Sequence, residues 1–207
     1  MIHPPGATGV AFSEADDGDL RQEDQARQRA SAALGIPSQW ARLDQVHGND
    51  VVRVSRPGPA GPGDALWTSE PGVPLAVFTA DCFGVILRSG EGVGVAHAGW
   101  RGARSSVVGA LRREMESSGF PPAEAFVGPG IGACCFEVGS DVSAQFPDFQ
   151  SHTSWGSNSV DLRSAIAADL EDLDVWIAPD CTSHVPGYFS HRRNRDARRL
   201  AAIGWVT

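Results

Sequence analysis

The chain has 207 residues, 17 of them basic and 25 acidic, and a formal net charge of −8 at pH 7. This length suits one well-buried domain. The acidic balance argues against nucleic acid or an anionic membrane as partner, because both select basic surfaces. The four cysteines suggest no regular disulfide framework. Without a signal-like apolar start or an apolar run of about 18 residues, we expect a reduced, soluble, cytoplasmic protein.

The first third of the chain predicts mainly short elements. β-Branched and aromatic runs favour strands, and Gly35 followed by Pro37 is typical of a helix end. Residues 56–63 contain three Pro and three Gly and predict a surface loop. The expected elements are a strand at 10–12, a helix at 20–34 and strands at 40–46 and 51–54.

Residues 75–102 are the stretch around which we expect the fold to be organised. Apolar runs at 75–79 and 85–87 predict buried strands, and a turn at 89–92 leads to a returning strand at 93–96. Cys82 and His97 lie at the ends of these runs. A Gly-rich turn around Arg101 then opens a predicted helix, which would present backbone N–H groups to an anion. We therefore expect a thiol, an imidazole and a guanidinium to converge.

The second half of the chain alternates irregularly between predicted helices and strands. This irregularity favours mixed sheets over a doubly wound parallel sheet. We predict an α/β (α+β) fold, a single domain over residues 1–207 with helices outside mixed β-sheets. The expected elements are a helix at 102–118 packed through Val107, Val108, Leu111 and Met115, a strand at 123–127, a short helix at 140–146, a polar loop at 150–159, a helix at 161–173 capped by Asp161, and strands at 175–178 and 201–206.

Five sequence blocks, in this order, resemble the signature blocks of the YfiH family, also called laccase-domain proteins or peptidoglycan-editing factors. They are Gln45–Gly48, Thr79–Cys82, His97–Gly102, Gly128–Gly132 with Phe136–Gly139, and Phe189–Arg193. The resemblance extends from about residue 40 to the C-terminus. The N-terminal region is shorter than the family pattern, and residues 194–199 depart from it.

The resemblance implies that His47, Cys82 and His97 bind one zinc ion. The donor chemistry agrees, because two imidazoles and a thiolate leave a fourth position for water or substrate. Zinc with an open position lowers the pKa of bound water toward neutrality. No CxxC or HxxxH pair is present to favour a structural four-ligand site.

The resemblance also implies phosphorolysis of adenosine, inosine, guanosine and methylthioadenosine, with deamination of adenosine in the same site. The small-molecule partners would be purine nucleosides and phosphate. Asp81 is the candidate for proton transfer, and Arg101 for phosphate binding. The assigned residues are Cys82, Asp81, His97 and Arg101 for catalysis, and Gly99, Trp100, Arg101 and Arg193 for substrate binding.

Three other functions stay open. A laccase-like copper polyphenol oxidase would need several His-x-His pairs, and the six histidines form none, so copper is less favoured than zinc. A cysteine-type amide hydrolase would use Cys82 as nucleophile and His97 as base, in keeping with peptidoglycan-precursor editing. The third is a non-enzymatic, zinc-stabilised binding module. We interpret Cys134 and Cys135 as packing or loop residues, and Cys181 as a weak candidate for the pocket.

Overall fold

Two β-sheets carry the fold, and the segment from Leu75 to Ala98 contributes strands to both. The computed structural model describes residues 1–207. One sheet has five strands, in the order β1 (Val10–Phe12), β13 (Leu200–Gly204), β6 (Leu75–Thr79), β2 (Ala41–Asp44) and β4 (Gly58–Pro62). The other has six, in the order β12 (Asp174–Ile177), β9 (Glu124–Val127), β7 (Phe83–Arg88), β8 (Val93–Ala98), β5 (Ala65–Thr68) and β3 (Val51–Arg53).

Both sheets mix parallel and antiparallel pairs, as the sequence predicts. In the six-stranded sheet β7 and β8 form the expected antiparallel hairpin, whereas β12 pairs parallel with β9. In the five-stranded sheet β13 pairs antiparallel with β6, whereas β2 pairs parallel with it. The single α+β domain with mixed sheets is therefore confirmed.

The first apolar run and the first strand of the hairpin belong to different sheets. β6 lies in the five-stranded sheet and β7 in the six-stranded sheet, so residues 80–82 cross from one sheet to the other. Asp81 adopts a φ of 85° in this crossover. The sheets approach closely just after it, because a Cβ on Gly84 would lie 2.4 Å from the Cβ of Ala202. Cys82 is thereby held at the junction of the two sheets.

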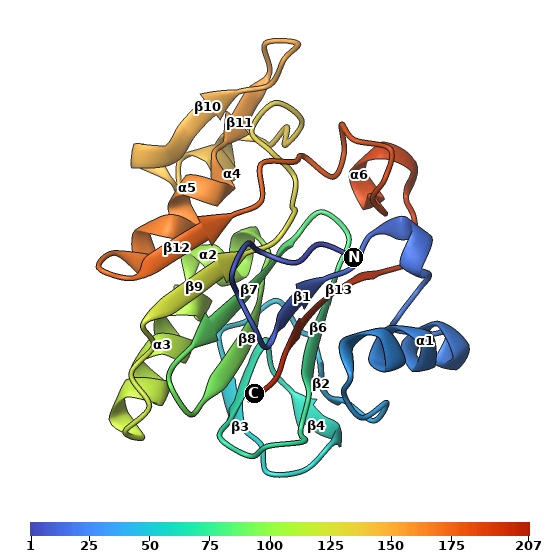
Figure 1. Cartoon of the computed structure of the whole chain (residues 1–207). Coiled ribbons are helices and arrows are strands. Elements are labelled where there is room, and N and C mark those ends of the chain that lie inside the picture. The colour runs from blue at the N-terminus through green and yellow to red at the C-terminus, as the bar shows by residue number, and fades with distance from the viewer.

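Helices cover the outer face of each sheet (Figure 1). α1 (Asp24–Leu34) packs Ala26 and Ala30 against the five-stranded sheet. α3 (Val107–Ser117) packs the predicted stripe of Val107, Val108, Leu111 and Met115 against the six-stranded sheet. A third apolar cluster, which includes Phe12, Leu75, Ile86 and Val95, fills the space between the sheets. The layers are therefore helix, sheet, sheet, helix.

The helices predicted at 20–34, 140–146 and 161–173 are shorter in the structure, and three other segments differ in kind or continuity. The helix expected at 102–118 is divided into α2 (Trp100–Arg104) and α3, because Ser106 has a φ of 53°, which interrupts a right-handed helix. The predicted loop at 56–63 contains β4, whose pairing with β2 could not be read from its Pro and Gly content. The polar segment at 150–159 forms the hairpin of β10 (Gln150–His152) and β11 (Asn158–Val160).

The remaining helical elements are short. α5 is capped as predicted, since the Asp161 side chain accepts a hydrogen bond from the backbone N–H of Ser164. None of the helices combines the length and the apolar character needed to cross a bilayer. The bounds are η1 (Ala15–Asp17), α4 (Ser140–Ser143), η2 (Pro147–Phe149), α5 (Leu162–Ala167), η3 (Ala168–Leu170) and α6 (His191–Asn194).

Candidate functional site

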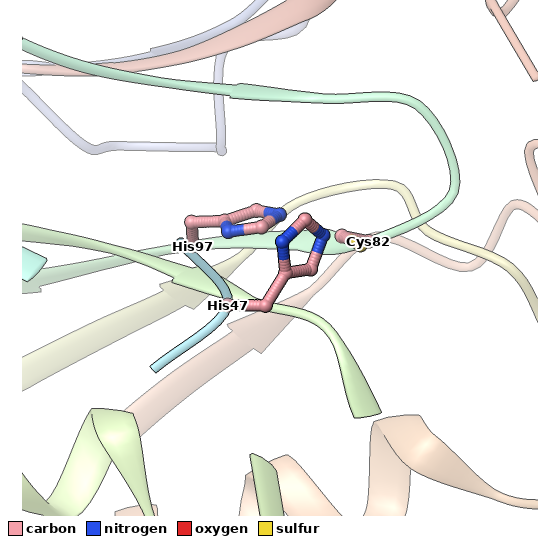
Figure 2. A group of neighbouring side chains, drawn as sticks. All are labelled: His47, Cys82 and His97. Carbon is pink, nitrogen blue, oxygen red and sulfur yellow. The ribbon is translucent and has the colours of Figure 1, made fainter. Parts of the chain in front are cut away.

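The three predicted metal ligands come together from three separate elements. His47 follows β2, Cys82 ends the crossover before β7, and His97 lies near the end of β8. Their ligand atoms all lie within 4.8 Å of one another. Figure 2 shows the two imidazole rings beside Cys82, and the rings meet edge to face with centroids 4.8 Å apart. The structure thus brings two nitrogen donors and one sulfur donor to one point.

Asp64, which the sequence did not single out, holds two of these ligands in place. Its fully buried carboxylate accepts a hydrogen bond from Nδ1 of His97 at 2.8 Å. It also accepts the backbone N–H groups of Val46, His47 and Gly48, at 3.2, 3.0 and 2.6 Å. An acceptor at Nδ1 leaves Nε2 of His97 free to bind a metal. The only sequence signal for this role was an acidic residue opening a buried strand.

The backbone around the triad is shaped to let the donors approach. His47 itself has a φ of 63°, a left-handed conformation that the hydrogen bonds to Asp64 help to maintain. Gly99 lies against both neighbouring ligands, since a Cβ there would be 2.9 Å from Sγ of Cys82 and 3.3 Å from Cδ2 of His47. A side chain at position 99 would therefore push these donors apart.

The triad is charged even without a metal. Burial alone would raise the pKa of Cys82, but hydrogen bonds with His47 and His97 lower it to about 6. Burial alone would lower the pKa of His97, but hydrogen bonds with Asp64 and Cys82 raise it to about 9. Burial likewise works against ionisation of Asp64, and the hydrogen bond from His97 lowers its pKa. Near pH 7 the metal-free site therefore holds a thiolate beside an imidazolium, and the thiolate is the form that binds metals.

Alkylation of the metal-free chain is expected to report this low pKa directly. The rate of Cys82 modification by iodoacetamide should rise with pH around a midpoint near 6, because the thiolate is the nucleophile. Peptide mass spectrometry can follow each cysteine separately. Cys135 is the internal control, since burial and its thiol neighbours raise its pKa to about 12. Added zinc should protect Cys82, and a midpoint close to the ordinary thiol value of 9.0 would contradict the assignment.

A cavity of about 380 Å³ opens onto the triad. This volume is within the range of small-molecule sites. Its lining includes the apolar side chains of Phe78, Trp100, Ile131, Phe136 and Leu162. It also includes the basic side chains of Arg21, His191, Arg192 and Arg199. Such a cavity can take a ligand that combines a flat apolar part with an anion.

Only some of the residues predicted for catalysis and substrate binding lie at the cavity. Asp81, Gly99 and Trp100 line the cavity. The Asp81 carboxylate accepts hydrogen bonds from the Thr182 hydroxyl at 2.7 Å and from the backbone N–H of Arg192 at 2.6 Å. These contacts hold the crossover at residues 80–82 against the segment that contains Thr182 and Arg192, and they fix the direction of the carboxylate.

The two arginines assigned to substrate do not belong to the cavity wall. Arg101 is exposed, and its guanidinium stacks on Trp100 with 4.4 Å to the ring centroid. Arg193 donates to the backbone carbonyls of residues 182, 185 and 188 and so braces that loop. The cavity instead takes its positive charge from Arg21, Arg192 and Arg199, and the last two lie in the arginine-rich segment at residues 192–199. Substrate contacts by Arg101 and Arg193 stay predictions.

Comparison with known proteins places this chain in a family. Residues 9–207 match the family model described as multi-copper polyphenol oxidoreductase laccase. A purine nucleoside phosphorylase of Deinococcus radiodurans is 38% identical, over 95% of this chain and 82% of the relative. A purine nucleoside phosphorylase of Streptomyces griseus is 35% identical, over 97% of this chain and 90% of the relative.

Solved structures agree with the fold. The crystal structure of YlmD from Geobacillus stearothermophilus has a TM-score of 0.80 and 28% identity, over 97% of this chain and 90% of that one. The hypothetical protein YfiH of Bacillus licheniformis has a TM-score of 0.82 at 22% identity, over 91% of this chain and 82% of that one. The predicted resemblance is confirmed: the chain belongs to the laccase-domain family of YfiH-type proteins.

Proposed function

We propose that this chain is a zinc-dependent purine nucleoside phosphorylase that also deaminates adenosine. The observation that carries the proposal is the position of the His47, Cys82 and His97 triad at a cavity lined by both apolar and cationic side chains. Relatives of 35–38% identity that are named purine nucleoside phosphorylase support it. The proposed substrates are adenosine, inosine, guanosine and methylthioadenosine, with inorganic phosphate as the second substrate.

The donor set of the triad fits zinc. Two imidazole nitrogens and one thiolate are typical zinc donors, and three protein ligands are the number found at catalytic zinc sites. His47, Cys82 and His97 would hold the ion, with Asp64 orienting His97 from behind. When bound, zinc would supply a Lewis acid and lower the pKa of a coordinated water.

The cavity wall provides what phosphorolysis requires from the protein. The reaction breaks the glycosidic C–N bond, joins a phosphate oxygen to the sugar carbon and leaves the purine with a proton. Arg192 and Arg199 would bind the phosphate, whose charge must be held next to the developing positive charge on the sugar. Phe78 and Phe136 offer apolar surface for the purine. Asp81, held in position by Thr182, is our candidate for proton transfer.

Removal of the half-buried Arg199 tests the phosphate contact. In Arg199→Ala we expect phosphorolysis to fall about 10- to 100-fold, since a lost charge-assisted contact costs roughly 1.5–3 kcal/mol. Deamination needs no phosphate and should change much less. Arg198→Ala is the matched control, because Arg198 pairs with Asp196 and stacks on Phe189 outside the cavity wall.

The same assay tests Arg101. A selective loss of phosphorolysis in Arg101→Ala would restore the phosphate contact that the sequence predicts for it. Equal rates for Arg199→Ala and wild type across a phosphate titration would rule out Arg199 as the phosphate ligand.

A screen of purine nucleosides with and without phosphate tests the function as a whole. The zinc-loaded chain should release free purine and sugar phosphate only when phosphate is present, and should convert adenosine to inosine without it. Chelation of the metal should abolish both reactions. Phosphate-independent release of purine, or no turnover of any nucleoside by the zinc-loaded chain, would contradict the proposal.

A cysteine-type amide hydrolase is the second candidate, because one observation favours it. The low pKa of Cys82 beside the imidazolium of His97 resembles the charge state of an activated thiol nucleophile. The two functions respond oppositely to metal. A hydrolase of this kind should act on amide substrates in the metal-free state and lose activity when zinc occupies Cys82, whereas the phosphorylase should need the ion.

A further inference from the structure

A second cluster of soft donor atoms lies outside the triad and plays no part in the proposed function. Cys134 and Cys135 follow the Gly-rich loop at residues 128–132, and Cys181 follows β12. The three Sγ atoms all lie within 4.8 Å of one another, and those of Cys134 and Cys135 are 3.6 Å apart. All three thiols are free. The interpretation of Cys134 and Cys135 as packing or loop residues did not foresee this convergence.

Backbone contacts hold the two segments of the cluster together. Gly130 and Cys181 form a parallel β-bridge, and the backbone N–H of Thr182 donates to the Gly130 carbonyl at 3.1 Å. The backbone N–H of Gly132 donates to Sγ of Cys181 at 3.2 Å. A Cβ on Gly132 would lie 3.3 Å from Cβ of Cys181 and 3.4 Å from Sγ of Cys134. The chain therefore has its smallest residue where the thiols approach.

The spacing of the three sulfur atoms suits a shared metal ion, and a disulfide within the adjacent pair is disfavoured. With metal–sulfur bonds of about 2.3 Å, sulfurs around one ion lie roughly 4 Å apart, within the observed range. A bond between adjacent cysteines is disfavoured, because Cα atoms joined by a trans peptide are about 3.8 Å apart and disulfides usually need about 4.4 Å or more. The cluster contains no histidine or carboxylate.

We propose that Cys134, Cys135 and Cys181 bind one thiophilic cation, with Cu(I) preferred, as a second metal site of this protein. Three thiolates and no nitrogen or oxygen donor form a soft ligand set, which selects Cu(I) or Zn(II). Structural zinc almost always takes four protein ligands, so a set of three favours Cu(I). Each thiol gives up its proton when the ion binds. Cys134 is exposed, which gives the ion access from solvent.

An ion at this site would join two segments that form the cavity wall. Ile131 and Phe136, on either side of the Cys134–Cys135 pair, line the cavity. On the other segment, Cys181 precedes Thr182, whose hydroxyl holds Asp81. Arg192 reaches across to the Cys135 carbonyl at 3.2 Å. The site shares no ligand with the His47, Cys82 and His97 triad, so it can be tested independently of the proposed phosphorylase activity.

Competition for Cu(I) against a chromophoric chelator, under anaerobic and reducing conditions, tests the proposal. The full chain carrying Cys82→Ala serves as background, because its only remaining cysteines are the three of the cluster. This chain should withhold one equivalent of Cu(I) and show ultraviolet thiolate-to-metal absorption. Adding Cys134→Ser or Cys181→Ser should weaken Cu(I) binding by more than about tenfold, since either change removes one of three ligands. Adding His152→Ala, an exposed imidazole on β10, should change nothing.

The outcomes separate the proposal from its rivals. Failure of the Cys82→Ala chain to retain Cu(I), or retention that neither serine variant weakens, would overturn the site. Retention of Zn(II) but not of Cu(I) in the parallel titration would overturn the copper preference. Circular dichroism and thermal melting establish that each variant is folded. Cys134→Ser is the safer variant for folding because position 134 is exposed, and Cys181→Ser then probes the opposite segment.

Discussion

Replacing Cys82 by alanine is expected to reduce bound zinc from about one ion per chain to almost none. The change removes the only sulfur donor of the triad and leaves His47 and His97, which hold zinc far less tightly as a pair. Nucleoside phosphorolysis should fall by more than about 100-fold, because changing even a residue behind a metal ligand commonly costs 10- to 100-fold. Metal analysis of the purified variant and a phosphorolysis assay measure both effects.

The fold should survive this substitution. Cys82 is only half-buried and belongs to none of the apolar clusters, so its loss leaves the core intact. Circular dichroism should match that of the unaltered chain. His152→Ala is the control for loss of an exposed donor and should keep its zinc. Full zinc retention by Cys82→Ala that persists when Cys134→Ser is added would show that Cys82 is not a ligand.

Replacing Asp64 by asparagine is expected to damage both the metal site and the fold. Asp64 is fully buried, and its carboxylate accepts hydrogen bonds from one ring nitrogen of His97 and from three backbone N–H groups. The asparagine amide has the same size but no negative charge. Its N–H₂ group would face the N–H donors that the carboxylate now accepts. Zinc affinity should fall about 10- to 100-fold, since His97 loses its orienting partner. The free energy of unfolding of the metal-free chain should fall by about 3–5 kcal/mol, as for a broken buried ion pair.

The loss of stability in Asp64→Asn should depend on pH. The pKa of His97 is raised from 6.5 to about 9, so its charge contributes full stability below pH 6.5, and this contribution disappears as the pH rises through 9. The pKa of Asp64 is lowered from 3.8, so its contribution is present above that pH and is lost as the pH falls below it. The difference in unfolding free energy between Asp64→Asn and wild type should therefore be largest between pH 3.8 and pH 6.5, where both charges are present.

Urea unfolding of both metal-free chains at several pH values measures this dependence. Asp50→Asn is the matched control, because Asp50 is exposed on the loop that carries His47 and its loss should change stability little. A constant difference between Asp64→Asn and wild type from pH 5 to pH 10 would show that the His97–Asp64 pair is not charged in the folded chain.

Local patterns in the sequence were enough to predict much of the scaffold. The β-branched runs and the Gly-containing turn predicted the β7–β8 hairpin, and the apolar spacing of Val107, Leu111 and Met115 predicted which face of α3 is buried. Asp161 was predicted as a helix cap because its hydrogen bond reaches only three residues along the chain. The three triad residues were found through the family blocks and the donor types that zinc prefers.

Only the tertiary structure decided how these parts meet. The crossover that places Cys82 depends on β6 and β7 joining different sheets, a choice that their similar apolar composition does not reveal. Asp64 contacts His97 across 33 residues, and Cys181 meets Gly132 across 49, so neither contact leaves a periodic signal in the sequence. Nor does the sequence show that Arg199 lines the cavity while the neighbouring Arg198 does not. Residue type and local spacing determined which side chains could bind a metal or take part in catalysis. The pairing of distant strands determined which of these side chains share a site.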